Sequence, residues 1–158
     1  MKRVLVTGAN GQLGKSIKRI SSNFKELKFV FTDVDELDIT NSKEVNTHFA
    51  SNKIEYCINC AAYTAVDKAE EEFDKAFLIN ATAVKNLAEA CKTSGTVLIH
   101  VSTDFVFDGT KSTPYTEEDT PNPISVYGKS KLQGEEYVQE ICERHFIVRT
   151  SWLYSEYG

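Results

Sequence analysis

Several features that mark other protein classes are missing from this sequence of 158 residues. It has no basic run, and its net charge of -5 disfavours nucleic acids and anionic membranes as partners. The first apolar stretch, VLVTGANG, breaks at Thr7–Gly8, which is too early for a signal peptide or a transmembrane helix. The sequence therefore predicts a cytoplasmic protein with no nucleic-acid and no membrane partner.

Metal-ligand and disulfide patterns are also scarce. No histidine–carboxylate cluster has metal-ligand spacing, so we expect no metal. Cys57 and Cys60 form the one CxxC pair among four cysteines. Residues three apart on a strand point to opposite faces, roughly 10 Å apart along it, whereas a disulfide needs Cα atoms within about 7 Å. We therefore expect both thiols to pack in the core.

What the sequence does contain is an alternation of strand and helix patterns. Short runs rich in valine, leucine and isoleucine predict buried strands at 2–7, 27–33, 54–62, 96–103 and 146–152. Apolar residues at helical spacing predict helices at 13–22, 41–52, 66–93 and 124–145. All three prolines lie in a loop at 108–123, whose length indicates a functional or poorly ordered segment.

This alternation predicts an α/β fold, a doubly wound parallel sheet of the Rossmann type with helices on both faces. In such sheets ligands bind beyond the carboxyl ends of the strands. That rule selects five short segments, which are Gly8–Gly14, Asp33, Cys60–Thr64, Ser102–Phe105 and Thr150–Trp152.

A dinucleotide site is predicted at the first of these segments. Gly8, Gly11 and Gly14 lie between a strand and a helix, where glycine lets the backbone approach a pyrophosphate and the helix N-terminus attracts its charge. Asp33 ends the second strand, where a carboxylate binds ribose hydroxyls and repels a 2′-phosphate, which favours NADH. A plain turn and a strand-end aspartate are the alternatives, and Asp35 and Asp38 compete with Asp33 for the role.

A proton-transfer site is predicted further along the chain. Tyr127 and Lys131 are four residues apart on an expected helix and so share a face. An ammonium near a phenol favours phenolate and lowers the phenol's pKa, which suits a tyrosine that exchanges a proton with a carbonyl oxygen. The hydroxyl of Ser102 or Thr103 is expected near the same oxygen, with helix capping as its alternative role. His100 lies inside a strand pattern, so we do not assign it a catalytic role.

The glycine pattern and the Tyr127–Lys131 pair resemble the extended short-chain dehydrogenases/reductases. Within that superfamily the sequence is similar to the dTDP-4-dehydrorhamnose reductase family, through motifs that run along the whole chain. These are TGANGQLG, LDITN, NCAAYTAVDKAE, STDFVFDG, PISVYGKSKLQGE and VRTSWLYSEYG. The resemblance implies NADPH or NADH as cofactor and a dTDP-sugar as substrate, whose 4-keto group is reduced to give dTDP-L-rhamnose.

The resemblance also implies roles for individual residues. Tyr127 would donate the proton, Lys131 would bind the nicotinamide ribose, and Thr103 and Asp104 would contact the substrate. Trp152 would lie against the sugar-nucleotide, with a core aromatic as the alternative. The remaining cofactor contacts would come from Gly8, Gly11, Gln12, Leu13, Gly14, Asp33, Asp38, Ile39, Ala61, Ala62, Tyr63 and Thr64.

One departure from the family limits what the chain is expected to do. Past the strand that holds Trp152, family members continue into further segments that include a smaller lobe for the substrate nucleotide, and that region is absent here. We therefore expect residues 1–158 to form a dinucleotide-binding and catalytic domain cut before the substrate lobe. Two alternative functions stay open, a nucleotide-sugar epimerase and a non-catalytic NADP(H)-binding regulatory subunit. A homodimer formed through the helices around Phe77 and Gln133 also stays open, although the sheet explains the apolar faces of these helices equally well.

Overall fold

A five-stranded parallel sheet forms the centre of the computed structural model, which describes residues 1–158. The spatial order is β2-β1-β3-β4-β5, and every neighbouring pair is parallel. The strands are β1 (Lys2–Thr7), β2 (Leu27–Phe31), β3 (Tyr56–Asn59), β4 (Val97–Thr103) and β5 (His145–Thr150). The predicted doubly wound fold is confirmed, and the strand order places its topological switch point between β1 and β3.

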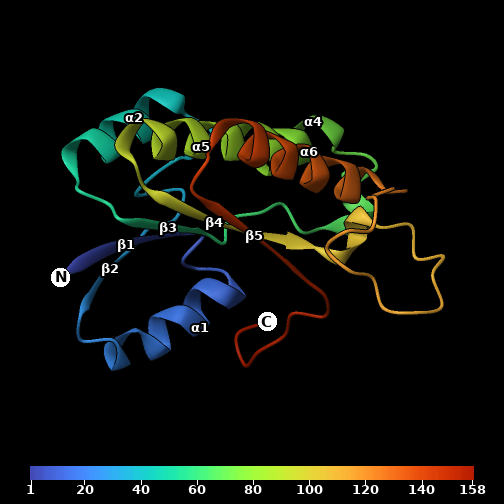
Figure 1. Cartoon of the computed structure of the whole chain (residues 1–158), viewed down its shortest axis with the longest axis horizontal. Coiled ribbons are helices and arrows are strands. Elements are labelled where there is room, and N and C mark those ends of the chain that lie inside the picture. The colour runs from blue at the N-terminus through green and yellow to red at the C-terminus, as the bar shows by residue number, and fades with distance from the viewer.

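The helices cover the two faces of the sheet unequally (Figure 1). Helix α1 (Gln12–Ile20) lies on one face, whereas α2 (Ser42–Ser51), α5 (Ala83–Ser94) and α6 (Val126–Ile141) lie on the other. Right-handed crossovers explain this, because the chain moves one way across the sheet from β1 to β2 and the opposite way in every later step. None of these helices has the length and apolar character needed to span a lipid bilayer.

The prediction of one helix over 66–93 is wrong. The chain there forms α3 (Val66–Ala69), α4 (Phe73–Phe77), a π-helical segment η2 (Leu78–Thr82) and α5. The turn between α3 and α4 carries acidic side chains that bind elsewhere. Glu70 accepts a hydrogen bond from the N–H of Val126 (2.8 Å), and Glu72 accepts one from the hydroxyl of Tyr63 (2.7 Å). These partners lie outside the predicted helix, nine and 56 residues away in sequence, so the helical pattern gives no sign of them.

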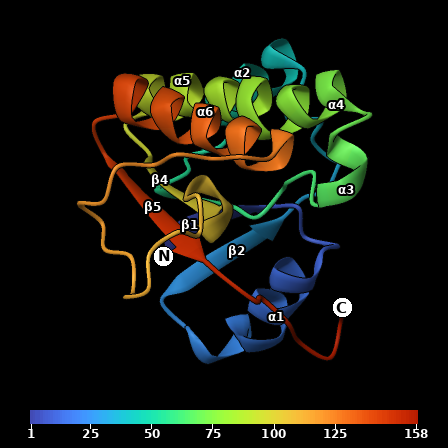
Figure 2. The ribbon, with the colours of Figure 1, turned by 90° about the vertical axis from the view of Figure 1, so that its right-hand side faces the viewer.

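The loop before α6 is folded onto itself rather than disordered. The Asp108 carboxylate accepts hydrogen bonds from Thr110, Tyr115 and Asn122, and these bonds hold its pKa well below the usual range. The ring of Tyr115 also stacks on Phe107 at 4.2 Å between centroids. The Ser125 hydroxyl, accepting from the N–H of Gly128 at 3.0 Å, then caps α6. Figure 2 shows this loop beside the end of β5.

Helix α6 approaches η2 closely enough that only a glycine fits between them. A Cβ at Gly134 would collide with the carbonyl oxygen of Asn80. The buried Asn80 side chain accepts from the N–H of Tyr63 (2.8 Å) and donates to the carbonyl of Tyr63 and the hydroxyl of Ser130 (both 3.0 Å). These bonds join the loop after β3 to the helix that carries Tyr127 and Lys131.

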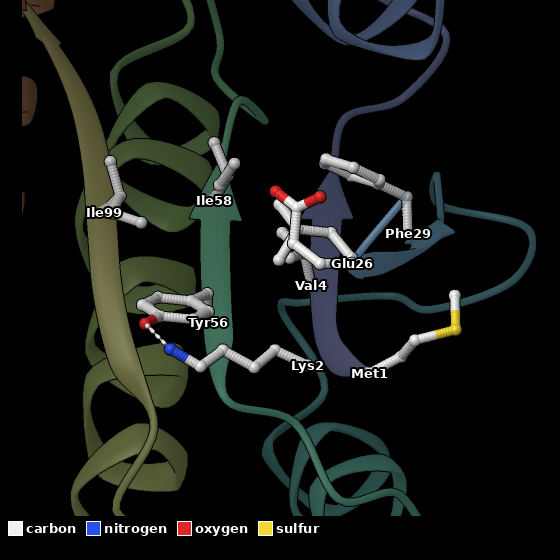
Figure 3. A pocket seen from close by; sticks show the side chains of 9 residues that line it. Met1, Lys2, Val4, Glu26, Phe29, Tyr56, Ile58 and Ile99 are labelled. Carbon is white, nitrogen blue, oxygen red and sulfur yellow. Dashed lines mark hydrogen bonds between the residues drawn. The ribbon is translucent and has the colours of Figure 1, made fainter. Parts of the chain in front are cut away.

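The face of the sheet that carries α1 is partly uncovered, which the sequence did not predict. β2 has no fully buried residue, and Phe146 and Val148 of β5 are 64% and 48% exposed. An apolar groove of about 690 Å³ crosses β2, β1, β3 and β4 on this face, lined by Phe29, Val4, Tyr56, Ile58 and Ile99 among others (Figure 3). The runs of apolar residues suit a sheet buried on both faces, and in this structure one face is buried only beside α1.

We expect Gly134→Ala to lower the free energy of unfolding by about 1–3 kcal/mol, because its methyl group would push α6 away from Asn80. In an open helix the same change stabilises by about 1 kcal/mol. Urea unfolding followed by circular dichroism measures the difference. Lys129→Ala, at an exposed position of α6, is the matched control. A stabilised Gly134→Ala protein would show that the close approach of α6 is unimportant.

Candidate active site

Two connected cavities lie at the carboxyl edge of the sheet. The first, of about 310 Å³, is lined by the loop after β1, the end of β2 and the loop after β3. The second, of about 470 Å³, is lined by the ends of β4 and β5 and by α6. Gly11, Cys60 and Ala62 line both cavities, so the two form one continuous cleft. This is the switch-point crevice in which doubly wound sheets bind their ligands.

The glycine loop has the geometry that its sequence predicted. Gly8 has a φ of 64°, and a Cβ there would collide with the backbone of Ala61. Gly14 is buried, and a Cβ there would collide with the backbone of Gly8 and Ala9. The glycine loop therefore folds tightly against the loop after β3, and the free N–H groups at the start of α1 stand at the edge of the cleft.

Asp33 lies in the first cavity and is tied to the glycine loop. Its carboxylate accepts hydrogen bonds from the N–H of Asn10 (2.8 Å) and the N–H of Val34 (2.9 Å). Asp38 also lines this cavity, but its Oδ1 accepts from both the N–H and the hydroxyl of Thr40. Both aspartates therefore line the cavity, and Asp33 is the one that is bonded to the glycine loop.

The loop after β3 contributes to the cleft with one exception. Ala61 and Ala62 line the first cavity and Thr64 lines the second, whereas Tyr63 lines neither. The Tyr63 ring is buried in a small cluster with Tyr127, and its hydroxyl binds Glu72. Asn80 holds the backbone of Tyr63 in this orientation. The structure thus places the Tyr63 side chain outside the lining of both cavities.

Tyr127, Lys131 and Thr103 come together in the second cavity. Tyr127 and Lys131 lie on one face of α6, as their spacing predicted, and both are buried. The Lys131 ammonium donates a hydrogen bond to the carbonyl of Val101 at 2.7 Å. The Thr103 hydroxyl donates to Asp104 (3.1 Å) and accepts from the N–H of Phe105 (3.2 Å), so it also caps a short helical turn, η3 (Asp104–Val106).

Burial shifts the pKa values of this pair toward their neutral forms. The pKa of Tyr127 is raised by burial and by Asp104, although the Thr103 hydroxyl lowers it. The pKa of Lys131 is lowered to about 8 by burial, while Glu135 and Cys60 raise it. The expected lowering of the Tyr127 pKa is therefore wrong for this structure, because burial has the largest effect on this phenol and raises its pKa.

His100 and the two CxxC cysteines occupy different environments. His100 is fully buried, its Nδ1 lies 3.1 Å from the Asn59 amide, and burial followed by the Lys131 charge lowers its pKa well below the usual value. Cys57 packs in the core as predicted. Cys60, in contrast, lies on the wall of both cavities, and burial raises the pKa of its thiol to about 12.

The remaining predicted residues lie around these groups. Gln12, Leu13, Asp104 and Trp152 line the second cavity and Ile39 lines the first. Trp152 is 91% exposed and has a φ of 51°, so it stands at the rim and is not a core aromatic. Sequence reasoning missed Val34, Leu37, Thr40, Val66, Ile79 and Leu153, which also line the cleft. These side chains are mostly apolar, and no chemical motif distinguishes them.

The whole chain matches a known protein family. The family described as "RmlD substrate binding domain" matches residues 1–158. The chain belongs to this family. It is also 44% identical, over its whole length and 54% of the relative's, to a protein of Aggregatibacter actinomycetemcomitans named dTDP-4-dehydrorhamnose reductase. The chain thus spans about half the length of the curated relatives it matches.

Solved structures of this family have the same fold. A Bacillus anthracis dTDP-4-dehydrorhamnose reductase, solved in complex with NADP, has 46% identity and a TM-score of 0.96, covering 100% of this chain and 56% of its own. The Clostridium acetobutylicum reductase has 49% identity and a TM-score of 0.94, covering 98% and 55%. A Brucella ovis UDP-glucose 4-epimerase, at 22% identity and a TM-score of 0.82 over 94% and 51%, shows the fold alone.

We expect the Tyr127 phenol to keep its proton above pH 10, since burial raises its pKa above the ordinary value of 10.0. The absorbance at 295 nm, followed against pH for the protein and for Tyr127→Phe, gives the titration of this phenol as the difference. N-acetyltyrosinamide is the reference, and circular dichroism confirms that the protein stays folded. A difference signal that appears below pH 10 would mean that the Lys131 charge dominates after all.

Proposed function

We propose that residues 1–158 are the dinucleotide-binding and catalytic domain of a reductase that uses NADPH or NADH. Its substrate would be dTDP-4-dehydro-6-deoxy-L-mannose and its product dTDP-L-rhamnose. The observation that carries this proposal is the buried Tyr127–Lys131 pair in a cleft continuous with the glycine loop. The names of its relatives support the choice of substrate.

The first cavity fits a dinucleotide. The glycine loop and the start of α1 would hold the pyrophosphate through backbone N–H groups, since the glycines let this loop fold tightly beside the cavity. Asp33 would bind the adenosine ribose, with Asp38 and Ile39 along the adenine and Ala61 and Ala62 on the path to the nicotinamide. When bound, the reduced nicotinamide supplies a hydride to the ketone carbon.

The second cavity fits the ketone. Lys131 would contact the nicotinamide ribose, while Thr103 and Asp104 would contact the sugar beside Tyr127. As the ketone carbon gains a hydride, its oxygen gains negative charge, and the Tyr127 hydroxyl gives that oxygen a proton. A raised pKa keeps the phenol protonated before the reaction, and the Lys131 ammonium one turn away stabilises the phenolate that remains.

The rest of the substrate site would come from sequence outside this chain. Trp152, at the exposed rim, would be the part of the nucleotide-sugar site that this domain supplies. The other half of the relatives' length would provide the grip on the nucleotide. A homodimer through the helices around Phe77 and Gln133 remains part of the proposal. It is supported by Phe73 in α4, which is 49% exposed and stacks on Phe77 at 4.4 Å.

In a version long enough to match its relatives, we expect Tyr127→Phe to lower kcat by about 10²–10⁴-fold, because a positioned acid contributes that much. The dissociation constant for NADPH should stay within about twofold. Loss of NADPH absorbance with the dTDP-4-keto sugar measures the rate, and quenching of protein fluorescence measures binding. Tyr154→Phe, at an exposed position, is the control.

The 158-residue chain itself should bind NADPH and NADH but turn over the sugar poorly or not at all. Near-full activity of this chain would contradict the proposal that most of the substrate site lies in the other half of the relatives' length. Unchanged turnover of the longer Tyr127→Phe protein would remove Tyr127 from the mechanism. Cofactor that stays bound as NAD through purification, with interconversion of sugar epimers, would favour an epimerase instead.

We expect Asp33→Asn to strengthen NADPH binding relative to NADH by about tenfold, roughly 1.4 kcal/mol, because it removes a negative charge that faces the 2′-phosphate. The amide oxygen can still accept the hydrogen bond from Asn10, so the glycine loop should keep its shape. Asp35→Asn, at an exposed position nearby, is the matched control. If both substitutions changed the ratio of the NADPH and NADH dissociation constants equally, Asp33 would not be the residue that contacts the ribose.

A further inference from the structure

Behind Lys131 lies an ion pair between Glu135 and Arg149, two residues to which the sequence analysis assigned no role. Glu135 follows Lys131 by one turn of α6 and is 1% exposed. Arg149 of β5 binds its carboxylate in a bidentate manner, with Nε to Oε1 at 3.0 Å and Nη2 to Oε2 at 2.6 Å. The guanidinium also lies 5.0 Å from the ring centroid of Phe107. Two elements and the loop before α6 therefore fix the position of this carboxylate.

We propose that Glu135 is a positioning residue whose buried charge keeps the Lys131 ammonium protonated, with Arg149 holding that carboxylate in place. The role of the Lys131 ammonium in catalysis rests on the proposed function. The electrostatic interaction between Glu135 and Lys131 does not depend on that function. A buried ammonium loses hydration and tends to become neutral at the pH of the cell. A fixed carboxylate on the same face of the helix offsets that tendency.

The other groups that face Lys131 do not supply this charge. Cys60 faces it from the loop after β3, and the thiol stays protonated because burial raises its pKa to about 12. His100 faces it from β4 and is neutral because burial and the Lys131 charge lower its pKa. Of the two groups that raise the Lys131 pKa, Glu135 and Cys60, only Glu135 therefore carries a charge at neutral pH.

Charged groups on the other elements packed against α6 are engaged elsewhere. Asp104 of η3 binds Thr103 and acts on Tyr127. Glu70, after α3, binds the N–H of Val126 at the start of α6. On α5, Lys85 and Glu89 pair with each other at the surface. Arg149 of β5 directs its hydrogen bonds to Glu135. The charged side chains of α3 and α4, which are Asp67, Lys68, Asp74 and Lys75, are not among the groups that shift the Lys131 pKa.

The direct test follows the Lys131 side chain by NMR, through the ¹³Cε chemical shift in labelled protein between pH 6 and 11, assigned with Lys131→Met. In the unaltered protein the midpoint should lie near the Lys131 pKa of about 8. Glu135→Gln, which keeps the side-chain shape, should lower the midpoint by about one pH unit. Glu136→Gln, on the next and exposed residue of α6, should leave it unchanged.

A second variant separates charge from structure. Arg149→Met breaks the same ion pair but leaves the Glu135 carboxylate with Lys131 as its cationic neighbour, so the midpoint should rise. If the Glu135–Arg149 pair had only a structural role, both variants should shift the Lys131 titration midpoint in the same direction. That result would overturn the proposal. An unchanged midpoint in Glu135→Gln would also overturn it. If one variant fails to fold, the direction of shift in the other decides.

Cofactor binding gives an independent measurement. Lowering the midpoint from about 8 to about 7 reduces the protonated fraction of Lys131 at pH 8 from about one half to about one tenth. Glu135→Gln should therefore weaken NADPH binding about fivefold at pH 8 and leave it unchanged at pH 6. If the unaltered chain bound no dinucleotide, the proposed function would fail while the NMR titration still decided the role of Glu135. Binding that Glu135→Gln weakens equally at both pH values would overturn the proposal.

Discussion

The position of α6 depends on the buried side chain of Asn80. Its three hydrogen bonds join the backbone of Tyr63, after β3, to the Ser130 hydroxyl of α6, and Ser130 in turn donates to the carbonyl of Tyr127 (2.8 Å). Gly134 allows the backbones to meet at this point. A buried amide left without these partners would cost more than the bonds themselves contribute, so the arrangement has little freedom to shift. The same contact therefore sets both the wall of the cofactor cavity and the place of the proton donor.

In the site that α6 forms, burial and nearby charge have opposite effects on the Lys131 pKa. Burial raises the pKa of Tyr127 and lowers that of Lys131, so both groups tend toward neutrality. A protonated phenol suits a donor, but a neutral amine would be of little use to the phenolate that forms. The site therefore needs a negative charge near Lys131 that is far enough from Tyr127 not to oppose proton release. Glu135, two turns beyond Tyr127 on α6 and held by Arg149, meets that requirement.

The sequence alone predicted the features that depend on local spacing. The five strands, the glycine loop and the shared face of Tyr127 and Lys131 all follow from patterns within a few residues. Features that depend on distant partners escaped it. The helix predicted over 66–93 is interrupted at 70–72, where Glu70 and Glu72 bind residues outside it. Tyr63 turns away from the cleft because Asn80 holds its backbone, and Arg149 reaches Glu135 across 14 positions of sequence.

Under the proposed function, reduction of the ketone and recognition of the sugar depend on different groups of residues. The cofactor cavity uses glycine, alanine and backbone N–H groups, and the Tyr127–Lys131 pair suits the reduction of many ketones. None of these groups distinguishes one sugar from another, and a fold of this kind serves unrelated substrates. Discrimination requires polar groups around the rest of the substrate, and on this chain few residues, chiefly Thr103, Asp104 and the exposed Trp152, lie on that side of the cleft. Under the proposed function, the Glu135–Arg149 pair would therefore affect the reduction of every substrate alike, whereas discrimination between sugars would rest mainly on the part of the relatives' length that this chain does not cover.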